Sequence, residues 1–185
     1  MKNEKQNPRR EFLSTTIKGA SLLAVGLAVS PFTQIFAAPA FAESELEFRT
    51  KLAMLGTLSL LASEVATDKA SNERVKMFAK FEVAEQTAIA TVLKEMATPT
   101  PAADTKATAM LTKLKGLSGA AFDVAYMAAQ VDTHQQLRSL VESFVSSSKN
   151  SSNTAEMHTR HIATVALATI KEHVEMSQML SAMLK

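Results

Sequence analysis

Residues 73–97 read ERVKMFAKFEVAEQTAIATVLKEMA, and they decide the fold because they have the pattern of one long amphipathic helix. A seam with alternating spacings of four and three residues, as in helices that pack on one another, runs through this stretch. It consists of Phe78, Glu82, Glu85, Ile89, Val92 and Met96. The helix is expected to end at Pro99 and Pro101, because proline lacks an amide hydrogen and restricts the residue before it.

Three more stretches show helical periodicity, at 46–68, 120–145 and 154–184, and a minor helix is expected at 102–115. The apolar face of the first stretch is Met54, Leu55, Leu58, Leu61, Ala62 and Val65. Four long helices that are apolar on one side only predict an all-α four-helix bundle. The connection between the second and third long helices is about twenty residues long, enough to cross the bundle as in ferritin-like folds.

Composition excludes several classes of site and partner. The chain has no cysteine, which rules out disulfides, thiolate metal sites, a cysteine nucleophile and an acylated lipoprotein N-terminus. Residues 1–42 hold five Lys/Arg against two Glu, whereas residues 43–185 hold fifteen Lys/Arg against sixteen Asp/Glu. The basic character therefore belongs to the N-terminal segment, and no nucleic-acid partner is expected.

The first 42 residues have the organisation of an export signal, with a basic stretch followed by a weakly apolar one at 17–29. The run Arg9-Arg10-Glu11-Phe12-Leu13 resembles the twin-arginine export motif, in which two arginines precede a Phe-Leu pair. That route carries folded proteins, so the resemblance implies that the domain folds before export. An uncleaved membrane anchor is disfavoured because polar residues interrupt the apolar stretch before the roughly twenty residues that a span needs.

Ala40 and Ala42 supply the small side chains that a signal peptidase accepts. Cleavage before Glu43 is the first choice and cleavage after Ala40 the second, which gives an export signal at 1–42 and a folded domain at 43–185. The expected partners are the export translocase and the signal peptidase, with an unidentified envelope partner or ligand. The expected location is the periplasm, with association with the outer membrane left open, and no transmembrane span is expected in 43–185.

Residues 117–126, LSGAAFDVAY, form the most specific motif of the chain, and weaker ones follow at 130–135, QVDTHQ, and 170–173, IKEH. Together with ATDKASN at 66–72 and VKMFA at 75–79, they resemble the ferritin-like bacterial envelope family known as domain of unknown function 4142. The resemblance implies a ferritin-like bundle outside the cytoplasm and no established activity. It also implies an acidic residue followed by histidine in the second helix, where this chain has Glu85-Gln86.

Glu82 and Glu85 are the most informative side chains, because they stand on the apolar seam of the helix at 73–97. Neither has a Lys or Arg three or four residues away. Moving an unpaired carboxylate into a bundle core costs several kcal/mol. A metal ion, a shared proton, water or a cation from another helix must therefore meet these acids.

A ferritin-like carboxylate site would use oxygen and nitrogen ligands from several helices and hold a divalent metal ion. The candidate ligands are Glu64, Glu82, Glu85, His134 and His173. Counted along the helices from the connecting segments, Glu64 and Glu82 differ by roughly 7 Å and His134 and His173 by roughly 12 Å. One compact site is therefore not expected to hold all five. The alternative is a set of interhelical hydrogen bonds and salt bridges, with Arg138 as one cation.

Two functions remain open. No nucleophile with an adjacent base and no glycine-rich phosphate loop is present, which favours a non-enzymatic binding or interaction module of the envelope. The alternative is a metal-binding ferritin-like protein that uses the seam carboxylates and the histidines. Structural roles are expected for Asp123 and Tyr126, and His158 and His161 are expected to be solvated.

Overall fold

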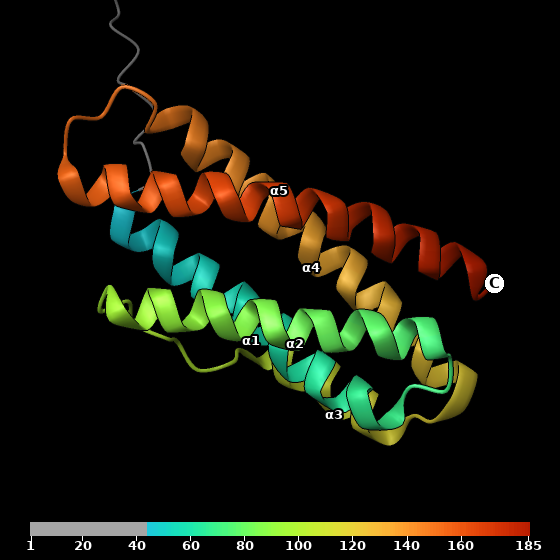
Figure 1. Cartoon of the computed structure of the whole chain (residues 1–185). Coiled ribbons are helices and arrows are strands. Elements are labelled where there is room, and N and C mark those ends of the chain that lie inside the picture. The colour runs from blue at the N-terminus through green and yellow to red at the C-terminus, as the bar shows by residue number, and fades with distance from the viewer. Residues whose placement is uncertain (1–43) are drawn as a thin grey trace, which may run out of the picture. The chain divides into compact units, whose positions relative to one another are not determined.

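The structure of this protein is a computed structural model, and it describes residues 44–185. These residues form five α-helices and no strand, which confirms the all-α class for this part of the chain (Figure 1). The helices are α1 (Glu45–Lys69), α2 (Glu73–Glu95), α3 (Thr105–Gly116), α4 (Gly119–Ser147) and α5 (Thr154–Met183).

The residues of the predicted export signal, Arg9, Arg10, Phe12 and Leu13, lie outside the described residues, as do Ala40 and Ala42 of the predicted cleavage site. Among residues 44–185, none of the helices combines the length and the apolar character that crossing a bilayer requires. This finding agrees with the expectation for the segment 43–185.

Side chains that accept hydrogen bonds from free backbone amides fix where most helices begin. Asn72 accepts hydrogen bonds from the amides of Arg74 and Val75 at the start of α2. The other capping side chains are Ser44 for α1, Asp104 for α3 and Asn153 for α5. Short polar side chains at these positions therefore set the helix starts close to their predicted places.

Helices α1 and α5 run in one direction and α2 and α4 in the other (Figure 1). Helix α1 packs against α2 and α4, and α4 packs against α5. The connection from α2 to α4 contains α3, which lies against α1 and α4. The long connection expected between the second and third long helices is thus present, and part of it is helical.

The apolar core is divided into two clusters, and both draw residues from all four long helices. One includes Ala62, Ala66, Val75, Phe78, Leu114, Phe122, Tyr126, Met127 and Leu180. The other includes Phe48, Leu52, Leu93, Leu137, Val141, Phe144, Ala163, Ala166 and Ile170. On each long helix, buried polar residues stand between the positions that supply the two clusters: Ser59 on α1, Glu82 and Gln86 on α2, Gln130, Thr133 and His134 on α4, and His173 and Ser177 on α5.

The buried line of α2 differs from the predicted seam. It includes Val75, Glu82, Gln86 and Leu93, at intervals of seven, four and seven residues. These intervals total eighteen residues, which is five turns of a straight α-helix with 3.6 residues per turn. A seam repeating every 3.5 residues drifts away from that line, so Glu85 is only half-buried.

The buried face of α1 also differs from the predicted one. Its central members are Gly56, Ser59, Ala62, Ser63 and Ala66, which are all small. The large apolar side chains of the predicted face are only half-buried: Met54, Leu55, Leu58, Leu61 and Val65. Small residues let α1 approach its neighbour closely, since a β-carbon added at Gly56 would lie 2.8 Å from Gln86 Oε1.

Candidate functional site

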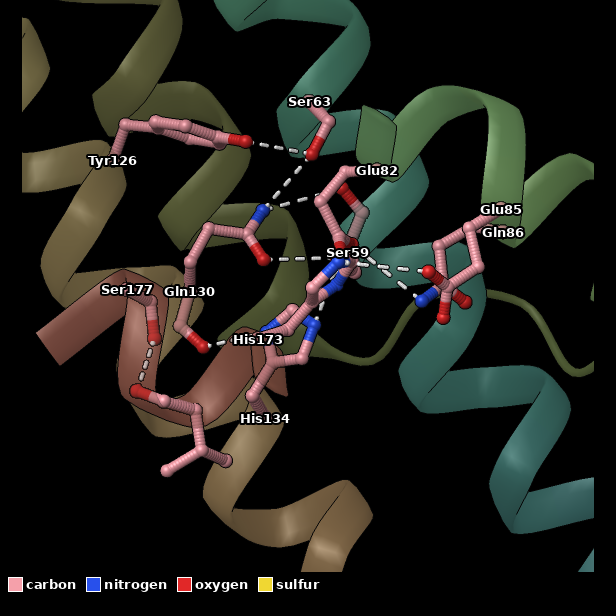
Figure 2. A network of polar contacts seen from close by, with 11 residues as sticks. Ser59, Ser63, Glu82, Glu85, Gln86, Tyr126, Gln130, His134, His173 and Ser177 are labelled. Atoms are coloured by element: carbon pink, nitrogen blue, oxygen red, sulfur yellow. Dashed lines mark hydrogen bonds and ion pairs between the residues drawn. The ribbon is translucent and has the colours of Figure 1, made fainter. Parts of the chain in front are cut away.

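A layer of buried polar side chains crosses the middle of the four long helices and separates the two apolar clusters (Figure 2). We call it the polar layer, and its members are Ser59, Ser63, Glu82, Gln86, Gln130, His134, His173 and Ser177. Every member is at most 5% exposed. Burying polar groups costs free energy unless each finds a partner, so their contacts decide what the layer can do.

Glu82 of α2 is the centre of the polar layer and receives contacts from the three other long helices. Its Oε1 lies 3.0 Å from His134 Nε2 on α4 and also contacts His173 Nδ1 on α5. Its Oε2 accepts a hydrogen bond of 2.5 Å from the Ser59 hydroxyl on α1. Burial alone would raise the pKa of the Glu82 carboxyl, but the hydrogen bonds from the two histidines hold that pKa well below its usual range.

The outward nitrogen of His134 is held by the backbone. His134 Nδ1 lies 2.9 Å from the carbonyl oxygen of Gln130, which can only accept, so Nδ1 must carry a hydrogen. A neutral His134 then directs the lone pair of Nε2 at Glu82 Oε1. An acceptor facing an acceptor at 3.0 Å is unfavourable unless a proton or a metal ion lies between them.

His173 has the same arrangement with a carboxylate in place of the backbone carbonyl. Its Nδ1 contacts Glu82, while its Nε2 lies 3.6 Å from Glu85 Oε2. Burial would lower the pKa of His173, but the hydrogen bond and charge of Glu82 outweigh it and raise that pKa. The raised pKa favours the protonated form of His173, which lies between the two carboxylates.

Ligand atoms of Glu82, His134 and His173 all lie within 4.8 Å of one another. Two imidazole nitrogens and a carboxylate oxygen are the ligands that zinc, iron and manganese use in proteins. In many metal sites the second nitrogen of each ligating histidine donates to a carbonyl or a carboxylate, which fixes the tautomer. Gln130 occupies that place for His134, and Glu85 lies 3.6 Å from the second nitrogen of His173, beyond hydrogen-bond distance.

A chain of hydrogen bonds extends from the carboxylate toward α1 and α4 (Figure 2). Ser59 Oγ lies 2.8 Å from Gln130 Oε1, and Gln130 Nε2 donates to Ser63 Oγ at 3.0 Å. Ser63 Oγ in turn lies 2.8 Å from the Tyr126 hydroxyl, whose pKa burial raises. These contacts fix the orientation of the Glu82 carboxylate, as second-layer partners do around metal ligands.

The structure brings together three of the five candidate ligands, Glu82, His134 and His173, and places Glu85 beside His173. Glu64 is exposed on α1, and the neighbouring Ser63 faces the polar layer instead. Adjacent residues of a helix point about 100° apart, so only one of this pair can face inward.

The estimate that His134 and His173 lie far apart along the bundle is wrong, because their ring centroids are 5.5 Å apart. That prediction treated the connection between α4 and α5 as a point and took the axes of these two antiparallel helices as aligned. The connection has its own length, and α4 is inclined to α5 (Figure 1). Residues at unequal distances from the connection can therefore meet.

Ser59, which contacts Glu82, and Ser63, which contacts Gln130, were not predicted from the sequence. A detectable signal existed, because Gly56, Ser59 and Ser63 recur at spacings of three and four residues on α1. Serines alone were not enough to separate an inward face from an outward one, since larger apolar residues occupy another face of the same helix.

The remaining candidates lie outside the polar layer. Arg138 pairs with Glu142 on the exposed side of α4, so it is not the cation that meets the buried acids. His158 and His161 are exposed, as expected, with ring centroids 6.4 Å apart.

Asp123 has the structural role that was expected for it. It accepts hydrogen bonds from the amides of Ser71 and Asn72 and from the Ser71 hydroxyl, in the turn between α1 and α2. The motif at 117–126 thus ties the start of α4 to this turn, and Tyr126 of the same motif bonds Ser63.

Glu85 connects the polar layer to the surface. Its Oε1 is buried without a hydrogen-bond partner among the described residues. It also lines a groove between α2 and α5, together with Ala88, Ile89, Val92, His161, Ile162, Val165, Ala166 and Thr169. Burial raises the pKa of the Glu85 carboxyl, which keeps a protonated form within easier reach than for a free carboxylate.

Comparison with known proteins gave one finding. A family model described as Domain of unknown function (DUF4142) matches residues 30–180. No curated protein and no solved structure matches the chain.

Proposed function

Because this chain belongs to the family described as domain of unknown function 4142, whose description assigns no activity, we propose its function from the polar layer: it binds one divalent transition-metal ion at Glu82, His134 and His173. The observation that carries the proposal is the convergence of two histidine nitrogens on one carboxylate oxygen. A neutral His134 presents a lone pair there, and so does a neutral His173 whose hydrogen is on Nε2, so one shared metal ion would satisfy both nitrogens and the carboxylate oxygen.

A proton is the competing cation. When no metal ion is bound, the cluster can hold a proton on His173, which then makes an ion pair with Glu82. That arrangement satisfies His173 but leaves the lone pair of a neutral His134 directed at the same carboxylate oxygen. A metal ion satisfies both histidines at once, and this difference favours a metal site over a purely structural network.

The finer fold assignment belongs to this proposal. We place the four long helices in a ferritin-like four-helix bundle, with the connection through α3 as its long crossover. The inward polar residues of all four helices support it, since carboxylate and histidine sites in such bundles are built from facing helices. The replacement of histidine by Gln86 limits the ligand set, and Gln86 instead donates to Glu82 Oε2 at 3.5 Å.

We further propose that the protein works after export, in the periplasm, as a non-enzymatic binding protein. The twin-arginine-type run at Arg9-Arg10 and the cysteine-free sequence support this location. A route that carries folded proteins suits a protein whose metal ligands come together only in the folded state. The export translocase and the signal peptidase are its partners during export.

The test is metal analysis of the full chain, expressed with its leader in a bacterium and recovered from the periplasm. Mass spectrometry for iron, manganese, zinc and copper should find close to one ion per chain. His134→Gln and His173→Gln should remove the ion, and the matched surface variant His161→Gln on α5 should retain it. Substoichiometric metal in the wild-type protein, with no rise in Tm on adding any of these ions, rejects the proposal.

Export has its own test, which does not depend on the metal. Replacing Arg9 and Arg10 by lysine should leave the protein in the cytoplasm with its leader attached. An N-terminus at Glu43 in the exported protein would establish cleavage after Ala42. Reproducible turnover of a substrate by the purified protein would contradict the non-enzymatic assignment.

A further inference from the structure

We propose that a second site, on the opposite side of α1 from the polar layer, binds a small organic cation of single-ring size. The site is a pocket of about 170 Å³ between α1, α4, α3 and the segment before α3. It shares no residue with the metal cluster, so it does not depend on the proposed function.

The distribution of residues on α1 is the first observation. Between residues 54 and 66 this helix presents small residues to the core, and four of its large apolar side chains in that stretch line the pocket. Met54, Leu55, Leu58 and Leu61 all line the pocket, and all four are half-buried. These four large side chains therefore lie away from the core, on a concave surface suited to an apolar ligand.

The size of the pocket defines the ligand. A buried apolar cavity of about 150 Å³ is large enough to bind benzene. The pocket of about 170 Å³ therefore accommodates one aromatic ring with a short substituent. Met54 and Met110 stand among its lining residues, and flexible thioether side chains adapt to ligand shape.

The charged lining residues define the ligand's polar end. Two carboxylates, Asp104 and Asp132, and one ammonium group, Lys106, line the pocket, so its charge is −1. Asp104 accepts from the amide of Ala107 at 2.7 Å, and Asp132 accepts from Gln136 Nε2 at 2.9 Å. A carboxylate has about four acceptor positions, so both can also accept from an ammonium group.

Asp132 marks the mouth of the pocket. It also lines an adjoining open groove, and Met54, Leu55 and Gln136 line both hollows. A ring bound among the apolar side chains can therefore direct its charged substituent toward Asp132 and solvent. A primary ammonium on a one-carbon arm from an aromatic ring combines the required size and charge.

The experiment uses the protein recovered from the periplasm after expression with its leader, and three probes of nearly equal shape. They are 4-fluorobenzylamine, which is cationic, 4-fluorotoluene, which is neutral, and 4-fluorobenzoate, which is anionic. Binding is followed by ¹⁹F line broadening in NMR. The amine should bind about tenfold more tightly than the neutral probe, the effect of one favourable charged contact, and the benzoate should be the weakest.

Two variants locate the site. Ala129→Met adds a side chain to the pocket wall and should abolish binding of the amine, whereas Ala128→Met, on the exposed face of α4, should leave it unchanged. Asp132→Asn keeps the shape of the mouth and should reduce binding of the amine to that of 4-fluorotoluene. Circular dichroism shows whether each variant is folded.

Three outcomes overturn the proposal: no binding by any probe, equal binding of the amine and the benzoate, or amine binding that survives both Ala129→Met and Asp132→Asn. Metal content serves to separate the two sites, because Ala129→Met should retain the metal ion and His134→Gln should retain the amine. A negative result for amine binding therefore does not bear on the proposed metal site, and a negative result for metal does not bear on the pocket.

Discussion

Glu82 is the residue on which the polar layer depends, because it contacts a serine and two histidines while it is fully buried. Its charge is stabilised mainly by partners on other helices. The carboxylate is therefore tolerable in the core of the folded domain but has no local support within α2 beyond Gln86.

Glu82→Gln should lower the free energy of unfolding of the metal-free protein by about 3 kcal/mol, because it leaves a buried histidine without its anionic partner. Glu64→Gln is the matched control on an exposed carboxylate, and its effect should be within about 0.5 kcal/mol. Urea denaturation at pH 6 measures both. Equal effects would show that the contacts of Glu82 contribute nothing specific.

The pH dependence of stability follows from His173. Its pKa in the folded protein is raised above the ordinary value of 6.5, so its contribution is present below pH 6.5 and is lost as the pH rises through the folded value. Glu82 has the opposite sign, because its pKa is lowered: its contribution is present above pH 4.5 and is lost as the pH falls toward its folded value.

The free energy of unfolding of the metal-free wild-type protein should therefore fall as the pH rises above 6.5. His173→Gln should remove most of this decline, and His161→Gln, an exposed histidine of the same helix, should preserve it. Chemical denaturation from pH 5 to pH 9 provides the comparison. A decline of the same size in His173→Gln would assign it to other groups.

Among the helices, the turn between α1 and α2 is a junction that a distant element stabilises. Asp123 reaches it from the first turn of α4 and accepts three hydrogen bonds there. Gly119 begins α4 with φ of +58°, a conformation in which L side chains are strained, so this helix start suits glycine. The motif at 117–126 is thus explained by the joining of three helices.

Asp123→Asn should cost about 2 kcal/mol of unfolding free energy, because hydrogen bonds to a charged acceptor contribute more than neutral ones. It should leave the metal content unchanged, since the hydrogen bonds described for the Asp123 carboxylate go to Ser71 and Asn72 of the turn and not to the polar layer. Asp68→Asn, on the exposed side of α1, is the control and should be nearly neutral. Loss of metal from Asp123→Asn would place Asp123 in the function of the polar layer.

Across the described part of the molecule, the polar layer interrupts a core that could otherwise be continuous. Two apolar clusters lie on either side of it, and the four long helices contribute to both. Buried charged groups contribute little to stability compared with apolar residues of similar volume. The layer is therefore better explained by binding than by folding.

Replacing the cluster as a whole tests this explanation. The triple variant Glu82→Met, His134→Leu, His173→Leu should be at least as stable as the metal-free wild type, with a gain of about 1–4 kcal/mol where packing is good. It should show no rise in Tm with added metal. A triple variant that fails to fold would mean that the layer is required to specify the fold.

The sequence by itself determined the helices, their starts and the all-α class, because apolar periodicity, capping side chains and prolines act within a few residues of one another. It also predicted that Glu82 and Glu85 face the core, since both lie on an apolar stripe without a local cation; this holds for Glu82, whereas Glu85 is only half-buried. Those features need no knowledge of the neighbouring helices.

Only the tertiary structure decided which side chains meet Glu82. Ser59 contacts Glu82, and Glu64 does not, because of how α1 is rotated about its axis. His134 and His173 lie at the same level because of the inclination of α4 to α5 and the length of the connection between them. These quantities are set by packing among all the helices, where a shift of one residue turns a side chain by about 100°. Spacing along one helix therefore identifies an inward acid, but its partners follow only from the packed helices.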